Sequence, residues 1–247
     1  MPLSTRAFRV LFRFLTGSIG AWLAVAATAQ GLAGQGLHLV QRVDEVLYGV
    51  DSISLAVLDN RHVLGNFVQV DLNQPRQSPN PASFVAECSQ PPRLARSAAL
   101  LTRAQVQLAE LRFEAVQVLD GSRFLAEFAC AASGQPGRAA QIARELFDRG
   151  GPSDMRSLFC DLQPDGSEQL RPQVELRFSE VENVVAVNRQ WLRSGQVTPA
   201  EISFGAAARW RIDRRAMQAR LLTATGEVLF VGACAPRPAA GGSKAVD

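Results

Sequence analysis

Four cysteines, Cys88, Cys130, Cys160 and Cys234, constrain what this 247-residue chain can fold into more than any other feature. Their even number favours two disulfides if the chain folds in an oxidising compartment. Four cysteines allow three pairings, and spacing alone does not select one. A metal site is the competing interpretation, but no two cysteines are close in sequence and the chain has only two histidines, whereas zinc sites usually show C-x-x-C pairs. We therefore expect no metal and no cofactor.

The N-terminal segment has the three parts of a secretory signal peptide. Three arginines lie in the first 13 residues, and no acidic residue occurs among the first 29. An apolar run from Phe14 to Ala29 follows, and it ends in Ala27-Thr28-Ala29, the small-residue pattern that a signal peptidase reads. The alternative is an uncleaved anchor, because no charge returns before Arg42. The apolar run is shorter than the roughly 20 residues that a spanning helix needs, so we predict that residues 1–29 are removed.

Charge and lysine content indicate the compartment and limit the partners. The chain holds 26 basic and 23 acidic residues, and residues 1–29 carry three of the basic ones. The remaining chain is balanced in charge, so bulk charge gives no support for a nucleic-acid partner. Lys244 is the single lysine, a bias typical of a GC-rich bacterial genome. We expect a periplasmic or secreted bacterial protein that meets a membrane only through its N-terminal segment, if that segment is uncleaved.

Two segments of the chain end alike and indicate an internal repeat. Residues 121–131 read GSRFLAEFACA and residues 226–235 read GEVLFVGACA, each a turn glycine, a strand-like run and Cys-Ala. The residues that lead into Cys88 also resemble those that lead into Cys160. If each copy begins and ends with a cysteine-bearing strand, the pairs are Cys88–Cys130 and Cys160–Cys234. A chance match is the alternative, because two copies are weak support for a repeat.

Short apolar runs with turn signals every 8–12 residues predict a mainly β fold. We predict two tandem antiparallel β units, small and barrel- or sandwich-like, each closed by a disulfide. The first is 30–135, with a proline-rich loop at 73–82, and the second is 152–236. One short α-helix within 136–151 would join them, because Pro136 suits a first turn and Gly150-Gly151-Pro152 suits a helix end. Residues 237–247, rich in Pro, Gly and Ala, are expected to be disordered.

The local patterns give more specific expectations. Apolar spacing predicts a short helix at 37–48. The run from about residue 105 to 115 fits a helix or a strand, and the Asp120-Gly121 turn favours a strand that forms a hairpin with 121–131. The other predicted strands are 53–58, 63–72, 173–178, 181–191, 197–204, 209–213, 217–222 and 227–233.

An arginine-rich run in the second unit is the best candidate for a binding surface. In residues 209–215, RWRIDRR, strand alternation places Trp210 and Ile212 on one face and Arg209, Arg211 and Asp213 on the other. Arginines in this arrangement suit an anionic ligand or an acidic protein groove. The alternative is a solvated strand face with cross-strand ion pairs. A second aromatic candidate is Trp191, for which burial in the core is the alternative.

The second unit resembles the membrane-bound or periplasmic inhibitors of C-type lysozyme, over about a third of the chain. The similar residues are Phe159-Cys160, Cys234 and Ser203-Phe204-Gly205-Ala206-Ala207-Ala208-Arg209-Trp210. Those inhibitors are small exported bacterial β-barrels whose Ser-Gly-Ala-basic-Tyr loop enters the lysozyme cleft, so the resemblance implies a loop that contains Ser203 and Gly205. In this chain Phe204 interrupts Ser-Gly, two extra alanines intervene and Trp210 replaces the tyrosine. The inhibitory role is therefore not carried over.

The sequence contains no G-x-S-x-G elbow, no H-E-x-x-H and no phosphate-binding loop, the motifs that would identify common catalytic sites. We predict a non-catalytic binding or scaffold protein whose partner is an unknown protein or an anionic ligand. The alternatives are an inhibitor of a periplasmic or host hydrolase such as lysozyme, and a hydrolase with an unrecognised site. A binding module should present a shallow patch, an inhibitor an exposed rigid loop at 203–208, and an enzyme a cleft with converging polar groups.

Overall fold

The chain forms two runs of antiparallel strands that meet in one continuous sheet, so the prediction of a mainly β fold is confirmed. The computed structural model describes residues 36–74, 81–149, 154–164, 173–206 and 208–236. The first run consists of β1 (Leu37–Val43), β2 (Val46–Val57), β3 (His62–Asp71), β4 (Pro81–Glu87), β5 (Arg93–Ser97) and β6 (Glu114–Ala115). Helices α2 (Ser122–Ala132) and α3 (Ala139–Arg149) follow. The second run consists of β7 (Arg156–Pro164), β8 (Gln173–Ser179), β9 (Val184–Val187), β10 (Gln190–Leu192), β11 (Gln196–Val197), β12 (Glu201–Phe204), β13 (Ala208–Asp213), β14 (Gln218–Thr223) and β15 (Val228–Pro236).

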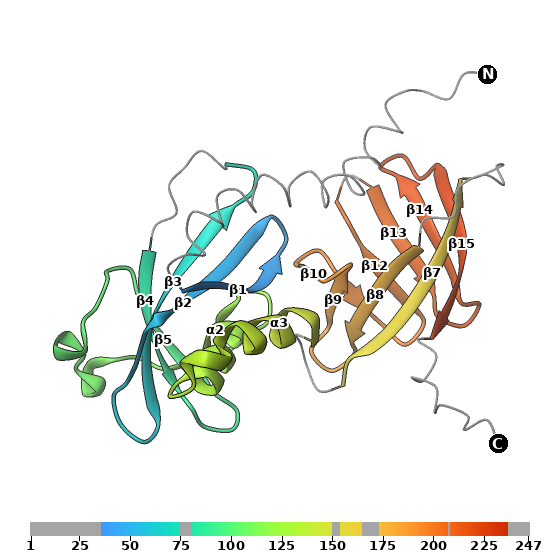
Figure 1. Cartoon of the computed structure of the whole chain (residues 1–247). Helices are drawn as coiled ribbons and strands as arrows, with labels where there is room; N and C mark the ends of the chain where they lie inside the picture. Colours follow the sequence, from blue (N-terminus) through green and yellow to red (C-terminus); the bar gives the residue numbers. More distant parts are fainter. Residues whose placement is uncertain (1–35, 75–80, 150–153, 165–172, 207, 237–247) are drawn as a thin grey trace, which may run out of the picture.

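Both helices pack beside the β1–β5 part of the sheet (Figure 1). Apolar side chains at alternate strand positions face the helices, as Val63 and Phe67 of β3 and Phe84 of β4 do. Helix α2 covers them with Phe124 and Phe128, which are fully buried. These side chains belong to one buried cluster of the strands, α2 and α3, which we call the first core. One apolar face of α2 lies in this core.

The helix predicted at 37–48 is wrong, since these residues form β1 and the start of β2. A bulge between Leu39 and Gln41 shifts the phase of β1 against β2. Val40 and Val43 are therefore both fully buried although they lie three positions apart. The bulge makes a strand imitate the spacing of a helical stripe.

Residues 121–131 do not form the predicted strand either, because Ser122–Ala132 is α2. Phe124, Phe128 and Ala132 recur every four positions and are all buried, which is the pattern of one helix face. Gly121 precedes the helix with a φ of 75°, a left-handed conformation that glycine adopts readily. The similar residues 226–235 lead into strand β15. The prediction that both copies of the repeat end in a strand is therefore wrong.

The strand expected from about residue 105 is replaced by irregular chain. Residues 103–105 and 108–110 form short 3-10 turns, and β6 has only two residues. The side-chain oxygen of Gln105 accepts hydrogen bonds from the backbone N–H and the hydroxyl of Thr102, which holds the first turn. Within the predicted connector at 136–151, the structure has a 3-10 turn, Pro136–Arg138, followed by α3. Because α2 precedes them as a second helix, the prediction of a single joining helix is not confirmed.

Strands β7–β15 enclose a second core without helices among the described residues. Val174, Leu176 and Phe178 of β8 are buried at alternate positions, as the sequence predicted. Ile202 of β12 and Ile212 of β13 meet them from the other end of the run. The strands predicted between 173 and 233 are confirmed with shifted boundaries, except that 181–191 and 197–204 each divide into two.

The predicted disulfide pairing is confirmed: Cys88 pairs with Cys130, and Cys160 pairs with Cys234. Cys160 and Cys234 lie directly opposite one another in β7 and β15 and are 2% and 7% exposed. Cys88 lies after β4 and is exposed, whereas Cys130 lies in α2 and is half-buried. The first bridge therefore joins a turn to a helix, not two strands.

The two runs of strands are joined by a parallel pairing of β1 with β10. Val43 lies opposite Trp191 in this pairing, and the resulting sheet has fifteen described strands. Trp191 is 1% exposed and, with Val184 and Ala186, belongs to the first core. The first core therefore contains side chains from the second run.

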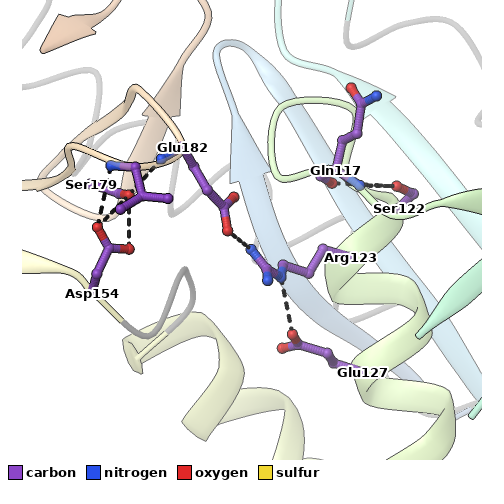
Figure 2. Close-up of polar contacts among 8 residues, drawn as sticks. Gln117, Ser122, Arg123, Glu127, Asp154, Ser179 and Glu182 are labelled. Carbon is purple, nitrogen blue, oxygen red and sulfur yellow. Dashed lines mark hydrogen bonds and ion pairs between the residues drawn. The ribbon is translucent and has the colours of Figure 1, made fainter. Parts of the chain in front are cut away.

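A polar network beside this pairing also links the two runs (Figure 2). Arg123 of α2 forms ion pairs with Glu182, at 2.6 Å, and with Glu127, at 3.3 Å. The Ser179 hydroxyl, which is fully buried, donates to the Asp154 carboxylate at 2.8 Å and accepts the backbone N–H of Glu182. The bond from Ser179 lowers the pKa of Asp154. The Arg123–Glu182 ion pair crosses between the two runs, and the other contacts hold its two members in place.

Some predictions fall on residues outside those described: the signal peptide at 1–29, the tail at 237–247 and most of the proline-rich loop at 73–82. Within the described ranges, no helix has the length and apolar character needed to cross a membrane.

Candidate functional site

The arginine-rich run lies on β13, in an antiparallel meander of β12, β13, β14 and β15. Ile212 is 1% exposed, and Trp210 is half-buried against the second core. Arg209, which precedes Trp210, and Arg211, which lies between Trp210 and Ile212, are exposed. The alternation predicted for residues 209–213 is therefore present, and it separates an apolar inner face from a charged outer face.

The register of the meander adds a third arginine to this outer face. Arg211 lies directly opposite Arg220 of β14, and Ser203 of β12 flanks Arg211 on the other side. Directly opposed residues in a sheet have Cβ atoms about 4.5–5.5 Å apart, and diagonal neighbours are about 7–8 Å apart. Arg209, Arg211 and Arg220 therefore form a compact group, which we call the basic face.

The cations of the basic face are poorly neutralised. Arg211 Nε lies 4.0 Å from Glu201 Oε1, and both side chains are about half exposed. Among the described residues, neither Arg209 nor Arg220 forms an ion pair. Like charges directly opposite in a sheet are destabilising, so the pairing of Arg211 with Arg220 lowers the stability of the folded chain.

A second acid on the outer side of β13, Asp213, is already used by the local turn. The backbone N–H groups of Ala216 and Arg215 donate to its carboxylate, and they lower the pKa of Asp213. The carboxylate therefore remains ionised, but its oxygens organise the β13–β14 turn. The charges of Arg215 and Arg220 lower the same pKa further.

Arg214, in the same run, has a structural role instead. Its guanidinium binds Glu180 at 2.5 Å, donates to the Thr198 carbonyl at 2.6 Å and lies over the ring of Phe178. Its side chain is 14% exposed. Because these contacts occupy its donors, Arg214 is not part of the basic face.

The remaining predicted site residues lie at the β12–β13 hairpin or away from it. Ser203 and Gly205 are half-buried, and the Gly205 N–H donates to Ser194 Oγ at 3.2 Å. Trp210 stacks on Phe204, with ring centroids 5.5 Å apart, on the inner side of the sheet. Trp191 is a correction: it was a candidate for the binding surface, but it is buried in the first core, because the β1–β10 pairing covers it.

Two further polar arrangements occur among the described residues. The network at the junction is one of them: its members Arg123, Glu182 and Asp154 line neither of two hollows in the described chain, and Glu127 lines one of these hollows. His38 Nε2 lies 3.0 Å from Ser52 Oγ, and burial lowers its pKa against the opposing charge of Asp51. No group of three or more metal-ligating side chains occurs among the described residues.

Sequence reasoning identified Arg209 and Arg211 but missed Arg220. A signal for it was available: a turn over residues 214–217 pairs Asp213 with Gln218, and that register places Arg220 opposite Arg211. Cross-strand pairs counted outward from this turn along β13 and β14 bring Arg211 and Arg220 together.

Comparisons with known proteins identified no similar protein. No family model matches the chain, and neither the curated proteins nor the solved structures gave a match. The function must therefore be argued from the residues themselves.

Proposed function

We propose that the protein is a non-catalytic binding protein that holds an acidic protein surface on its basic face. The observation that supports this function is the direct opposition of Arg211 and Arg220, next to Arg209, on an outward sheet face. Three guanidinium groups at this spacing can each form paired hydrogen bonds with carboxylates. A partner that supplies those carboxylates would relieve the repulsion that the free protein carries.

A protein partner fits better than a small ligand because the basic face is a strand surface. Small-molecule sites are concave and bury most of their ligand, whereas two hollows found in the described chain are lined by other residues. Apolar side chains border the arginines, since Leu222 lies opposite Arg209 and Val231 opposite Arg220. Val231 is 37% exposed, so an acidic partner with an apolar rim would gain contact area as well.

A polyanion-binding measurement tests this function. Poly-L-glutamate serves as the carboxylate probe, and its affinity for the protein is followed by fluorescence anisotropy at rising salt. The double variant Arg211→Gln/Arg220→Gln should bind at least tenfold more weakly, and its salt dependence should be shallower, because fewer charges are neutralised. The control Arg61→Gln/Arg103→Gln removes two exposed arginines of the first run and should bind as the natural protein does. Equal loss in both variants, or no binding by the natural protein at low salt, contradicts the proposal.

The protein is proposed to act outside the bacterial cytoplasm, in the periplasm or after secretion. Two disulfides are consistent with folding in an oxidising compartment. The N-terminal charge and apolar pattern supports export through a cleaved signal peptide. Expression of the full chain in a bacterial host should yield a periplasmic product that begins at Gln30. A product that retains residue 1 in the membrane fraction supports the anchor instead.

The finer architecture is also a proposal: two β units, each stapled by its own disulfide. Two separate clusters of buried side chains and two non-overlapping disulfide loops support it. Side chains of β9 and β10 also belong to the first core, so the two proposed units would share part of it.

An enzyme inhibitor is the second candidate function, and the β12–β13 hairpin favours it. Gly205 has a φ of 94°, and the stacked pair of Phe204 and Trp210 fixes the two strands that lead to it. The described parts of this hairpin are therefore held in place on both sides of the segment that would enter an enzyme cleft. C-type lysozyme is the test enzyme: dose-dependent loss of its activity, removed by Gly205→Arg, supports this second function, and unchanged activity at micromolar protein contradicts it.

A further inference from the structure

The two disulfides of this chain differ in their surroundings. Cys160 and Cys234 are enclosed between β7 and β15. Cys88 is exposed, and both Cys88 and Cys130 line a groove of about 590 Å³ between the β4–β5 turn and helices α2 and α3. We call this hollow the disulfide groove.

We propose that the Cys88–Cys130 bridge is a thiol–disulfide exchange site for a protein dithiol, of the class that reduces or rearranges disulfides. Exchange requires a thiolate to reach a disulfide sulfur, so access decides which bridge reacts. Exposed disulfides are also the more easily reduced ones. The groove provides that access at one bridge, and the strands deny it at the other.

The reaction balances with the dithiol as the only co-reactant. One thiolate of the dithiol attacks the sulfur of Cys88, the more exposed residue, and forms a mixed disulfide while the Cys130 sulfur leaves as a thiolate. The second thiol of the dithiol then attacks the dithiol's own sulfur in the mixed disulfide. This step forms the disulfide of the dithiol and releases the Cys88 sulfur as a thiolate. The dithiol loses two electrons and two protons, and the bridge gains both as two thiols.

The walls of the groove favour a partner that inserts a loop. Ala131 of α2 and Pro92 line the groove together with the bridge, and Ile142 and Leu146 of α3 also line it although they are 7% and 4% exposed. Glu127 and Glu145 lie on the same walls with one cation, Arg138. Two carboxylates against one cation disfavour anionic small thiols there, so a thiol carried on a protein loop is the favoured partner.

The test measures which cysteines become alkylated when the natural protein is treated with reduced thioredoxin or with dithiothreitol under native conditions. Peptide mass spectrometry follows each cysteine over time. Cys88 and Cys130 should be labelled at least tenfold faster than Cys160 and Cys234 with both reductants. Simultaneous labelling of all four cysteines, earlier labelling of Cys160 and Cys234, or no reduction by thioredoxin would overturn the proposal.

A pair of variants separates access from global unfolding. Ala131→Trp fills the groove from an exposed helix position, and it should slow reduction of Cys88–Cys130 at least fivefold. Ala140→Trp adds the same side chain to an exposed position of α3 outside the groove and should leave the rate unchanged. Circular dichroism checks that both variants are folded. Equal rates in the two variants contradict the role of the groove.

Discussion

Phe124 of α2 and Trp191 of β10 pack with ring centroids 6.1 Å apart, although their segments are closed by different disulfides. The contact exists because the parallel pairing of β1 with β10 carries Trp191 into the first core. The two runs of strands are therefore linked through an apolar core as well as through a sheet edge.

The first prediction concerns this contact. Trp191→Ala should lower the free energy of unfolding by about 3–5 kcal/mol, the usual cost of truncating a buried large aromatic side chain. The matched control is Trp210→Ala, which removes a half-buried indole from the second core and should cost less. Urea unfolding followed by circular dichroism measures both. A smaller loss for Trp191 than for Trp210 would show that the junction contributes little.

The second prediction follows from the disulfide connectivity. A protease site inserted between Arg149 and Asp154 lies outside both disulfide loops. After cleavage, a denaturing gel without reductant should show two fragments, because no covalent bond joins them. Under native conditions the fragments should elute together, since β1–β10 pairing and the Arg123–Glu182 ion pair still connect them. One full-length band on the denaturing gel contradicts the connectivity, and separate native elution contradicts the strength of the junction.

The third prediction compares two glycines with left-handed backbones. Gly226 has a φ of 89° and open space around an added Cβ, so Gly226→Ala should cost only the conformational strain of about 1–2 kcal/mol. Gly205 has a φ of 94°, and an added Cβ would overlap the carbonyl oxygen of Ala208. Gly205→Ala should therefore lower the melting temperature more than Gly226→Ala does. Equal shifts would mean that the β12–β13 hairpin relaxes freely.

The fourth prediction concerns His38 and pH. Burial lowers the pKa of His38 below its ordinary value of 6.5, so the unfolded chain binds this proton at a higher pH than the folded chain does. The stability contributed by the neutral imidazole is fully present above about pH 6.5 and is lost as pH falls below that value and through the lower pKa of the folded chain. His38→Gln, which cannot take up a proton, should show a smaller loss of stability between about pH 7.5 and 5.5. Parallel losses in the two proteins exclude His38 as the cause.

Strand alternation was the most readable part of this sequence. In β8 and β13 the side chains of one face are more buried than those of the other, so the two-residue period is visible along Val174, Leu176 and Phe178 and again along Trp210 and Ile212. Where the period is broken, sequence reasoning failed for a physical reason. The bulge in β1 placed Val40 and Val43 on one face, and this spacing is also that of a helix.

The disulfide pairing was predicted correctly on a ground that was only half right. The second bridge does join the first and last strands of its run, as expected from the sequence. The first bridge ends in α2 instead of a strand. Phe124, Phe128 and Ala132 recur every four residues, which is a helical spacing that the match between the two Cys-Ala endings does not reveal. Similar letters at two cysteines can lead to a helix in one place and a strand in the other.

The basic face shows the same limit at the level of the site. Alternation along one strand was enough to group Arg209 with Arg211, but Arg220 joins them only through the hairpin register. The burial of Trp191 depends on a strand pairing between distant parts of the chain, and no local pattern carries that information.

The pairing of β1 with β10 also determines when the first run of strands and its core can be completed during folding. Gln190 donates to the Asp44 carbonyl across 146 positions of sequence, and contacts of such long range form late because the loop between them must first close. A chain that emerges from its N-terminus exposes the edge of β1 and an unfilled space next to Phe124 until β10 is available. During that interval the open strand edge is a site for pairing with other chains. Folding of the second run is therefore also what protects the first from aggregation.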